Sequence, residues 1–269
     1  MSPVSSVLES RELLWNLTLR ELRTKYRRSF LGWTWSMLNP LATVAIYSFV
    51  FSVLFRASAP PGDPSGLTGF AYYLLAALLP WNFFALVTGL GMVAIANNSG
   101  LVRRVAFPRE VLVFSNTLHA CVQFGIEMGL LCVVLLVVGS PILPWIPLMV
   151  VVSALLAVFA SGFALALSAL SVYFRDMTYL WTIFTQVWFF LTPVVYGPDL
   201  LQARAPEWAN QVLRLNPMQA FVSSYRDLLY DAKCPSFMRL LMMFCAAILS
   251  LSIGWLFFHR MGRRLAEEV

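Results

Sequence analysis

The sequence contains little charge for its length. Asp, Glu, Lys and Arg make up 12% of its 269 residues, which is about half of their share in a soluble domain. Hydrophobic residues make up 59%, and the mean hydropathy is +0.75. This balance excludes an ordinary soluble domain and predicts a helical membrane protein with several spans.

The sequence also lacks motifs for chemistry of its own. The dipeptide Gly-Lys never occurs, so there is no GxxxxGK[ST] phosphate loop. The HExxH zinc motif and a GxSxG motif with triad partners are missing too. The four cysteines have neither metal nor redox spacing and fit small buried hydrophobes better. We expect no enzyme activity, no cofactor or metal bound by this chain, and no nucleic-acid partner.

Long apolar runs predict six spans, because about 20 apolar residues in a helix cross the hydrocarbon core. The expected spans are residues 30–55, 70–96, 111–138, 148–174, 179–196 and 240–258. Basic residues are concentrated at both termini and in the loop at residues 97–110. The positive-inside rule therefore places both termini and that loop in the cytoplasm. We expect an all-α polytopic fold with a spanning domain at residues 30–259 and a cytoplasmic tail at residues 260–269.

Residues 1–29 form a separate cytoplasmic segment with a predicted amphipathic helix. Its apolar residues recur every three or four positions, at Trp15, Leu19, Leu22 and Tyr26. A parallel basic stripe consists of Arg20, Arg23 and Arg27. A helix of this kind lies in the membrane interface, although a simple positively charged anchor explains the arginines equally well.

The loop at residues 197–236 is too long and too apolar to be unstructured. Asn216-Pro217 interrupts it, and a helix is expected on each side of this break. In the second helix one apolar face consists of Phe221, Val222, Tyr225, Leu228 and Leu229, and we expect Arg226 and Asp227 to point away from that face. The loop either dips into the bilayer or covers an exit.

Polar residues follow one side of the third expected span. They are spaced three, four and four apart, at Asn116, His119, Gln123 and Glu127. A charge near the middle of the bilayer costs about 2.5–3.5 kcal/mol on insertion scales, so Glu127 should face the bundle or a wet cavity, or be protonated. Two interpretations remain open: a polar wall of a translocation path, and a seam of hydrogen bonds between helices or protomers.

Aromatic residues gather at the ends of the expected spans. Most fit an interfacial belt, while some have the amphipathic character that stacks on sugar rings. The candidates for the lining of a channel are Trp33, Trp35, Tyr72, Trp81, Trp188 and Tyr196, together with the polar stripe.

The stretch NNSGLVRRVAFPREVL, residues 97–112, is basic and apolar at once. A short helix is expected from Gly100 to Phe107, ended by Pro108. Its expected apolar centre consists of Leu101, Val102, Val105 and Phe107, and its charged rim of Arg103, Arg104 and Arg109. Such a surface is typical of a docking site for another protein. A plain positive-inside loop would explain the arginines but not the apolar residues among them.

Five stretches, in order, resemble the ABC-2 type permeases that export polysaccharides. They are ELRTKYRRSFLGWTWSMLNP at residues 21–40, VRRVAFPRE at residues 102–110, YFRDM at residues 173–177, LTPVVY at residues 191–196 and LNPM at residues 215–218. The resemblance implies the ABC-2, or type V exporter, fold, and a homodimer paired with two separate ATPase subunits that bind ATP and Mg. It further implies transport of lipid-linked glycans, such as O-antigen, teichoic acid or galactan, across the bacterial cytoplasmic membrane.

The resemblance also implies roles for particular segments. Residues 97–110 would be a coupling helix seated in the ATPase, and the N-terminal helix a gate at the cytoplasmic entrance. The loop at residues 197–236, called the outer loop below, would gate the exit through Phe221, Tyr225 and Leu228. The pyrophosphate of a polyprenyl carrier would be drawn by nearby cations, namely Arg23, Lys25, Arg27 and Arg28.

Three alternatives stay open. The first is an ABC-2 exporter of a drug or small lipid, since aromatic walls suit those substrates as well. The second is a proton-coupled secondary transporter that uses His119 and Glu127. The third is a membrane scaffold without a transport role.

Overall fold

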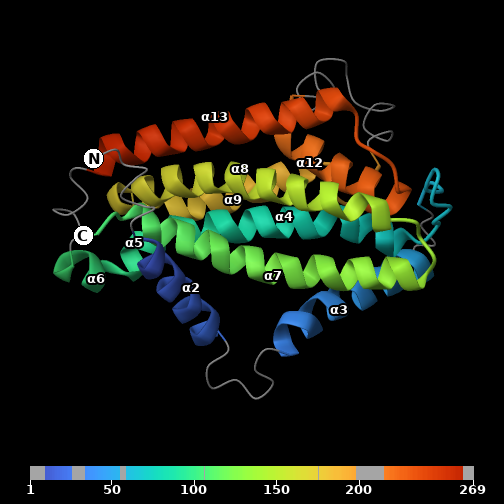
Figure 1. Cartoon of the computed structure of the whole chain (residues 1–269), viewed down its shortest axis with the longest axis horizontal. Helices are drawn as coiled ribbons and strands as arrows, with labels where there is room; N and C mark the ends of the chain where they lie inside the picture. Colours follow the sequence, from blue (N-terminus) through green and yellow to red (C-terminus); the bar gives the residue numbers. More distant parts are fainter. Residues whose placement is uncertain are drawn as a thin grey trace.

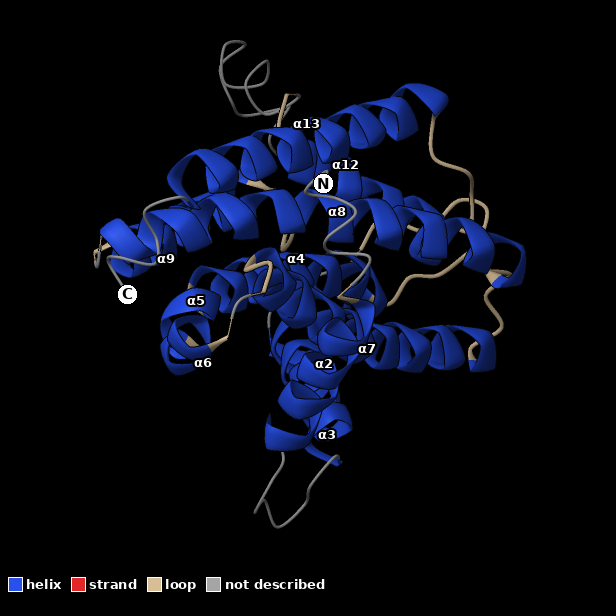
Figure 2. Cartoon of the chain, turned by 60° about the vertical axis from the view of Figure 1, so that its left-hand side comes forward, coloured by secondary structure: helices blue, strands red, loops and turns tan. Residues whose placement is uncertain are grey.

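The computed structural model describes residues 10–25, 34–54, 59–105, 107–174, 176–197 and 215–262. Within these ranges the regular structure is helical and contains no strand, as Figure 2 shows, which confirms the expected all-α class. The helices are α2 Arg11–Lys25, α3 Trp35–Ser48, η2 Phe49–Leu54, α4 Phe70–Met92, α5 Ala94–Asn97, α6 Ser99–Arg104, α7 Glu110–Val137, η3 Leu143–Trp145, α8 Ile146–Tyr173, α9 Met177–Leu191, α12 Pro217–Tyr225, η4 Arg226–Asp231 and α13 Phe237–Gly262.

Among the described residues, four helical stretches are long and apolar enough to cross a membrane. They are Phe70–Met92, Glu110–Val137, Leu143–Tyr173 and Phe237–Met261, and they coincide with the second, third, fourth and sixth expected spans. The first expected span is partly covered by α3 and η2, and residues 30–33 of it lie outside the described residues. The fifth corresponds to α9, which has only 15 residues. The six-span count therefore stays a prediction.

Two expected helix ends are wrong for local reasons. The second span was expected to run to residue 96, but α4 ends at Met92, because Val93 (φ −94°, ψ 3°) leaves the helical conformation before α5. The fifth was expected to run to residue 196, but α9 ends at Leu191. Thr192 has an extended backbone there, because it precedes Pro193 and the residue before a proline is disfavoured in the helical conformation.

The helices form a layered bundle in which α4 occupies the middle. Figures 1 and 2 both place α13 on one side of the bundle and α2 and α3 on the other, with α4, α7 and α8 between them. The main packing pairs are α13 with α8, α8 with α4, α4 with α7, and α7 with α2. Buried residues make up 72% of the spanning window of α4 but only 17% of that of α13. A helix that is apolar all round is expected in such a central position.

Glycines bring α8 and α13 into direct backbone contact. A Cβ atom added to Gly254 would lie 2.0 Å from the carbonyl oxygen of Gly162, and one added to Gly162 would lie 2.3 Å from the backbone of Ser250. The Ser250 hydroxyl also donates to the carbonyl of Phe159 on α8 (2.8 Å). Small residues four apart on a spanning helix allow this close approach. In lipid no hydrophobic effect drives helices together, so the close packing itself supplies the energy of association.

The two ends of the bundle carry different structures. One end, on the left in Figure 1 and called the knuckle end below, holds α5, α6, the start of α7 and the last turns of α13. There the Tyr173 hydroxyl at the end of α8 donates to the carbonyl of Met261 on α13 (2.9 Å). The opposite end holds residues 59–69, the turn between α7 and α8, and the pair formed by α12 and η4.

The glycine crossing leads to a stability prediction. Gly254→Ala should lower the stability of the protein by about 1–3 kcal/mol, because the added methyl group meets backbone atoms that cannot move aside alone. The matched control is Gly129→Ala on α7, where an added Cβ meets nothing within 4 Å. Thermal unfolding of the purified proteins in one detergent measures both effects. Equal midpoints for the two variants would contradict the close crossing.

Candidate functional site

The segment between α4 and α7 forms a knuckle, defined here as α6 with residues 105–110. Asn98 (φ −113°, ψ 21°) separates α5 from α6, and its carbonyl accepts from the amides of Leu101 (2.9 Å) and Val102 (3.0 Å). The helix ends at Arg104, since Val105 is already extended (φ −129°, ψ 131°). The expected continuation to Phe107 is therefore wrong, and Pro108 additionally disfavours helix at that residue.

The knuckle divides its side chains between the bundle and the surface. Its apolar residues Leu101, Val102 and Phe107 are partly buried against the core. Arg103, Arg104 and Val105 are exposed, and a hollow of about 470 Å³ is lined by three arginines and three apolar residues: Val102, Arg103, Arg104, Val105, Phe107 and Arg109. Pro108 and Arg109 are half-buried. The outward surface is thus basic, with Val105 as its exposed apolar residue.

A buried carboxylate ties the knuckle to the end of α13. Glu110, the first residue of α7, is 6% exposed, and its Oε1 lies 3.1 Å from Nε2 of His259. The imidazole ring of His259 packs edge-on against the indole of Trp255, with ring centroids 4.8 Å apart. The sequence analysis missed this pair, because the two residues are far apart in the chain and neither belongs to a motif.

Helix α2 packs on α7 with a different face from the one that its periodicity indicated. Leu17 and Thr18 are its buried residues, and Thr18 donates to the carbonyl of Leu14 (2.8 Å). Trp15 is 60% exposed, while Leu19 and Leu22 are half-buried. The expected apolar stripe is therefore not the face that α2 buries against α7. The side chain of Trp15 is exposed on the surface of the bundle instead. Tyr26 lies outside the described residues.

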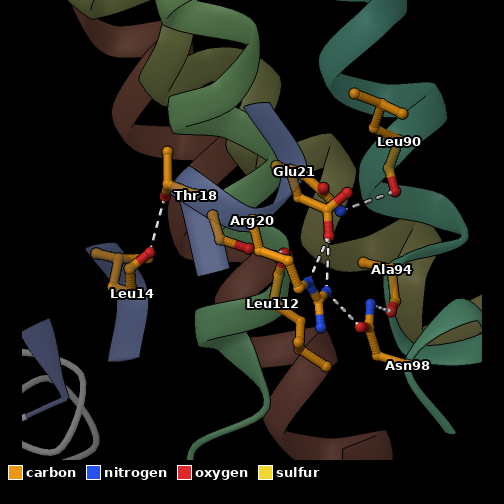
Figure 3. Close-up of polar contacts among 10 residues, drawn as sticks. Leu14, Thr18, Arg20, Glu21, Leu90, Ala94, Asn98 and Leu112 are labelled. Atoms are coloured by element: carbon orange, nitrogen blue, oxygen red, sulfur yellow. Dashed lines mark hydrogen bonds and ion pairs between the residues drawn. The ribbon is translucent and has the colours of Figure 1, made fainter. Parts of the chain in front are cut away.

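A direct polar contact joins α2 to Asn98, the residue before α6. Figure 3 shows Arg20 between Glu21 and Asn98. Its Nη2 donates to Oδ1 of Asn98 (2.6 Å) and to Oε1 of Glu21 (2.6 Å). The Asn98 amide nitrogen donates in turn to the carbonyl of Ala94 on α5 (2.9 Å). The residue at which α5 and α6 separate is therefore bound through its side chain to α2.

The polar stripe of α7 faces the bundle interior. Asn116, His119 and Glu127 are buried, and Gln123 is half-buried. Asn116 donates to the carbonyl of Leu90 on α4 (3.3 Å), a bond between two helices, whereas Gln123 donates to Glu127 within α7 (2.9 Å). Glu127 and Tyr72 also border a cavity of about 50 Å³ between α3, α4 and α7. The stripe combines a seam between helices with one small cavity.

The candidate aromatic residues lie in different environments. Trp81 is 5% exposed and meets Trp188 of α9 edge-on, with ring centroids 6.2 Å apart. Trp35 is 46% exposed on α3. Tyr196 is half-buried beyond the end of α9. Trp33 lies outside the described residues.

The candidate residues of the outer loop lie inside the helical bundle. Phe221, Tyr225 and Leu228 have no exposed surface. Arg226 is buried as well, so the expectation that it points away from the apolar face is wrong. Arg226 follows the buried Val222 by four residues, so helical spacing places both side chains on one face. Backbone carbonyls after α9 accept its hydrogen bonds there. The helix expected near Trp208 lies outside the described residues.

Of the candidate residues for an anionic group at the entrance, the structure places one side chain. Arg23 is exposed on α2. Lys25 is the last residue of α2, and its side chain lies outside the described part of the structure. Arg27 and Arg28 lie outside the described residues.

Known proteins resemble this chain over nearly its whole length. The ABC-2 type transporter family model matches residues 12–230. An O-antigen export system permease protein RfbA of Myxococcus xanthus is 29% identical over 99% of this chain and 98% of its own length. A protein of the same name from Klebsiella pneumoniae is 26% identical over 95% and 94%. The polysialic acid transport protein KpsM of Escherichia coli is 26% identical over 44% of each chain. This chain therefore belongs to the ABC-2 type transporter family.

Proposed function

We propose that this chain is the membrane permease of an ATP-driven exporter of lipid-linked polysaccharide. The observation that carries the proposal is the likeness to an O-antigen export permease over 99% of the chain. The glycan is carried on a polyprenyl pyrophosphate and crosses the bacterial cytoplasmic membrane. The chain works as a homodimer with two ATPase subunits, which bind ATP and Mg because this chain has no phosphate loop.

The knuckle is the surface on which the ATPase acts. Arg103, Arg104 and Val105 protrude, while Leu101 and Phe107 fix the knuckle to the core. A force on the exposed part therefore reaches the start of α7 and, through the Glu110–His259 contact, the end of α13. In this arrangement the knuckle end lies in the cytoplasm, in agreement with its arginines.

The conduit lies between the two copies of the chain. Helices α3 and α9 leave large apolar side chains exposed, among them Ile46 (60%) and Ile183 (61%). Trp35 is exposed on α3, and Tyr72 and Glu127 border the small cavity between α3, α4 and α7, so these residues lie close to such a path. Trp81 and Trp188 are enclosed within one protomer and would join the lining only when α9 moves.

The entrance lies beside α2. Arg23 is exposed there, and Lys25, Arg27 and Arg28 follow it in the sequence. Guanidinium groups bind phosphate oxygens through paired, charge-assisted hydrogen bonds. The pyrophosphate of the carrier is therefore captured at this segment before the sugars enter.

Two alternative functions predict different results when export is measured. An exporter of drugs or small lipids would leave glycan export intact when the gene is removed. A proton-coupled transporter using His119 and Glu127 would continue after ATP depletion and stop when the proton gradient collapses. Loss of glycan export on ATP depletion, with the gradient clamped, supports the proposal over both.

Charge reversal at the knuckle tests the docking surface. Arg103→Glu with Arg104→Glu should weaken binding of the ATPase subunit by about tenfold or more, because each exposed cation would become an anion at the contact. Arg260→Glu is the control, an exposed arginine at the end of α13. Pull-down of the ATPase and export of glycan are the measurements. Normal binding and export by the double variant would exclude this surface.

The contact between Arg20 and Asn98 tests transmission to α2. Arg20→Ala should reduce the glycan exported per ATP hydrolysed by roughly two- to fivefold, since an exposed charged contact contributes at most about 1 kcal/mol. Asn98→Ala should act alike, and the two changes together should add little to either alone. Arg11→Ala, at an exposed arginine on the same helix, is the control. Fully additive effects would show that the two residues act separately.

A further inference from the structure

The chain turns sharply after α9, and the turn at residues 192–196 is buried at its start. Thr192, Pro193 and Val194 are buried, although no residue of α9 itself is. The carbonyls of this turn no longer belong to a helix, and within a membrane protein each needs another donor. Two residues of the outer loop, Asn216 and Arg226, supply donors.

Asn216 binds the last turn of α9 to the first turn of α12. Its Oδ1 accepts from the indole nitrogen of Trp188 (2.9 Å) and from the amide of Met218 (3.1 Å). Its Nδ2 donates to the hydroxyl of Thr192 (3.0 Å) and to the carbonyl of Leu191 (3.4 Å). One side-chain amide thus uses both of its donors and both lone pairs of its oxygen.

Arg226 holds the other side of the turn. Its guanidinium donates to the carbonyls of Pro193 (2.6 Å) and Val194 (2.7 Å), with longer contacts to the carbonyl of Tyr196 (3.4 Å). It lies 3.8 Å above the ring centroid of Tyr73 on α4. Arg226 forms no ion pair with another described residue. Backbone carbonyls and one aromatic ring therefore stabilise this cation, which is only 5% exposed.

The cation persists at neutral pH. Burial lowers the pKa of Arg226 to about 10, and the nearby side chains of Tyr73 and Asp231 oppose that lowering. A charge held in this way is strongly attached to its acceptors, because separation would leave it both desolvated and unpaired.

The helices that carry this pair are themselves fixed to the bundle. The Tyr225 hydroxyl lies 2.7 Å from that of Ser153 on α8. The Tyr230 hydroxyl lies 2.8 Å from the carbonyls of both Pro60 and Leu67. Along α9, in contrast, Tyr179, Ile183 and Phe190 are more than half exposed.

We propose that Asn216 and Arg226 are positioning residues that keep residues 192–196 joined to α12 and η4 throughout the transport cycle. This turn clamp makes the C-terminal end of α9 the fixed end of that helix. Opening of the path then turns α9 about this end, and α12 with η4 does not swing open as an independent flap. The inference rests on the proposed export function.

A reversible cross-link tests the turn clamp. Thr192→Cys and Asn216→Cys are combined in a chain whose four native cysteines are replaced, and the full complex with its ATPase is assayed. In the reduced state the pair lacks the Asn216 bonds, so export should fall several-fold. Oxidation to a disulfide should restore export to within about twofold of the cysteine-free chain, because the covalent bond replaces the lost contact. The two single-cysteine variants, treated with the same oxidant, are the controls.

The opposite result overturns the inference. If α12 and the turn separate during transport, the disulfide will stop export and reduction will recover it. Absence of glycan export by the unmodified complex would instead refute the proposed function, and the two failures are therefore distinguishable.

A conservative variant provides a second readout. Arg226→Lys keeps the charge but replaces the planar fork with a single ammonium group, which cannot reach the same carbonyls together. Export should fall by roughly tenfold, as expected for lost hydrogen bonds of a charged group, while ATP hydrolysis by the assembled complex continues. Unchanged export with Arg226→Lys would show that the guanidinium does not hold the turn.

Discussion

A backbone amide or carbonyl that is buried without a hydrogen-bond partner costs free energy, and this constraint governs how the chain is interrupted at Asn98 and after α9. At Asn98, the carbonyl of the interrupting residue accepts two amides of the next helix, and its side chain binds α5 and α2. After α9, a side-chain amide and a buried guanidinium take over the free carbonyls. At both places, side-chain donors bind backbone carbonyls beside the break.

These interruptions also explain how the bundle divides into parts. Helices α4, α7, α8 and α13 pack along their lengths and are joined again at the knuckle end by the contacts of Glu110 with His259 and of Tyr173 with Met261. Helices α2, α3 and α9 lie outside this group and keep exposed apolar residues. Helix α2 packs on α7, and α9 contacts α4 and α8 through its tryptophans. The polar contacts of Arg20 with Asn98 and of Trp188 with Asn216 add a fixed point to α2 and α9.

The sequence predicted the parts of this structure that depend on local pattern. Long apolar runs located the four long helices to within a few residues, and Asn216-Pro217 correctly marked the start of a helix. Patterns failed where a distant partner decides the outcome. Arg226 was expected to point away from the apolar face of its helix, yet it is buried, because carbonyls after α9 and the ring of Tyr73 stabilise its guanidinium there. The buried face of α2 and the Glu110–His259 contact depend on α7 and α13 in the same way. The roles assigned to the knuckle, the entrance and the channel stay predictions.

The close approach of Gly162 and Gly254 has a consequence for how such proteins can diverge. In most helix pairs, a larger residue on one side is accommodated by a smaller residue on the other. Here neither position has a side-chain atom to give up, because the backbones themselves are in contact. A second substitution at the crossing therefore cannot compensate for a larger residue at either glycine. Relatives that carry larger residues at these two positions must have a wider spacing between the corresponding helices, with a different geometry along the whole length of α13.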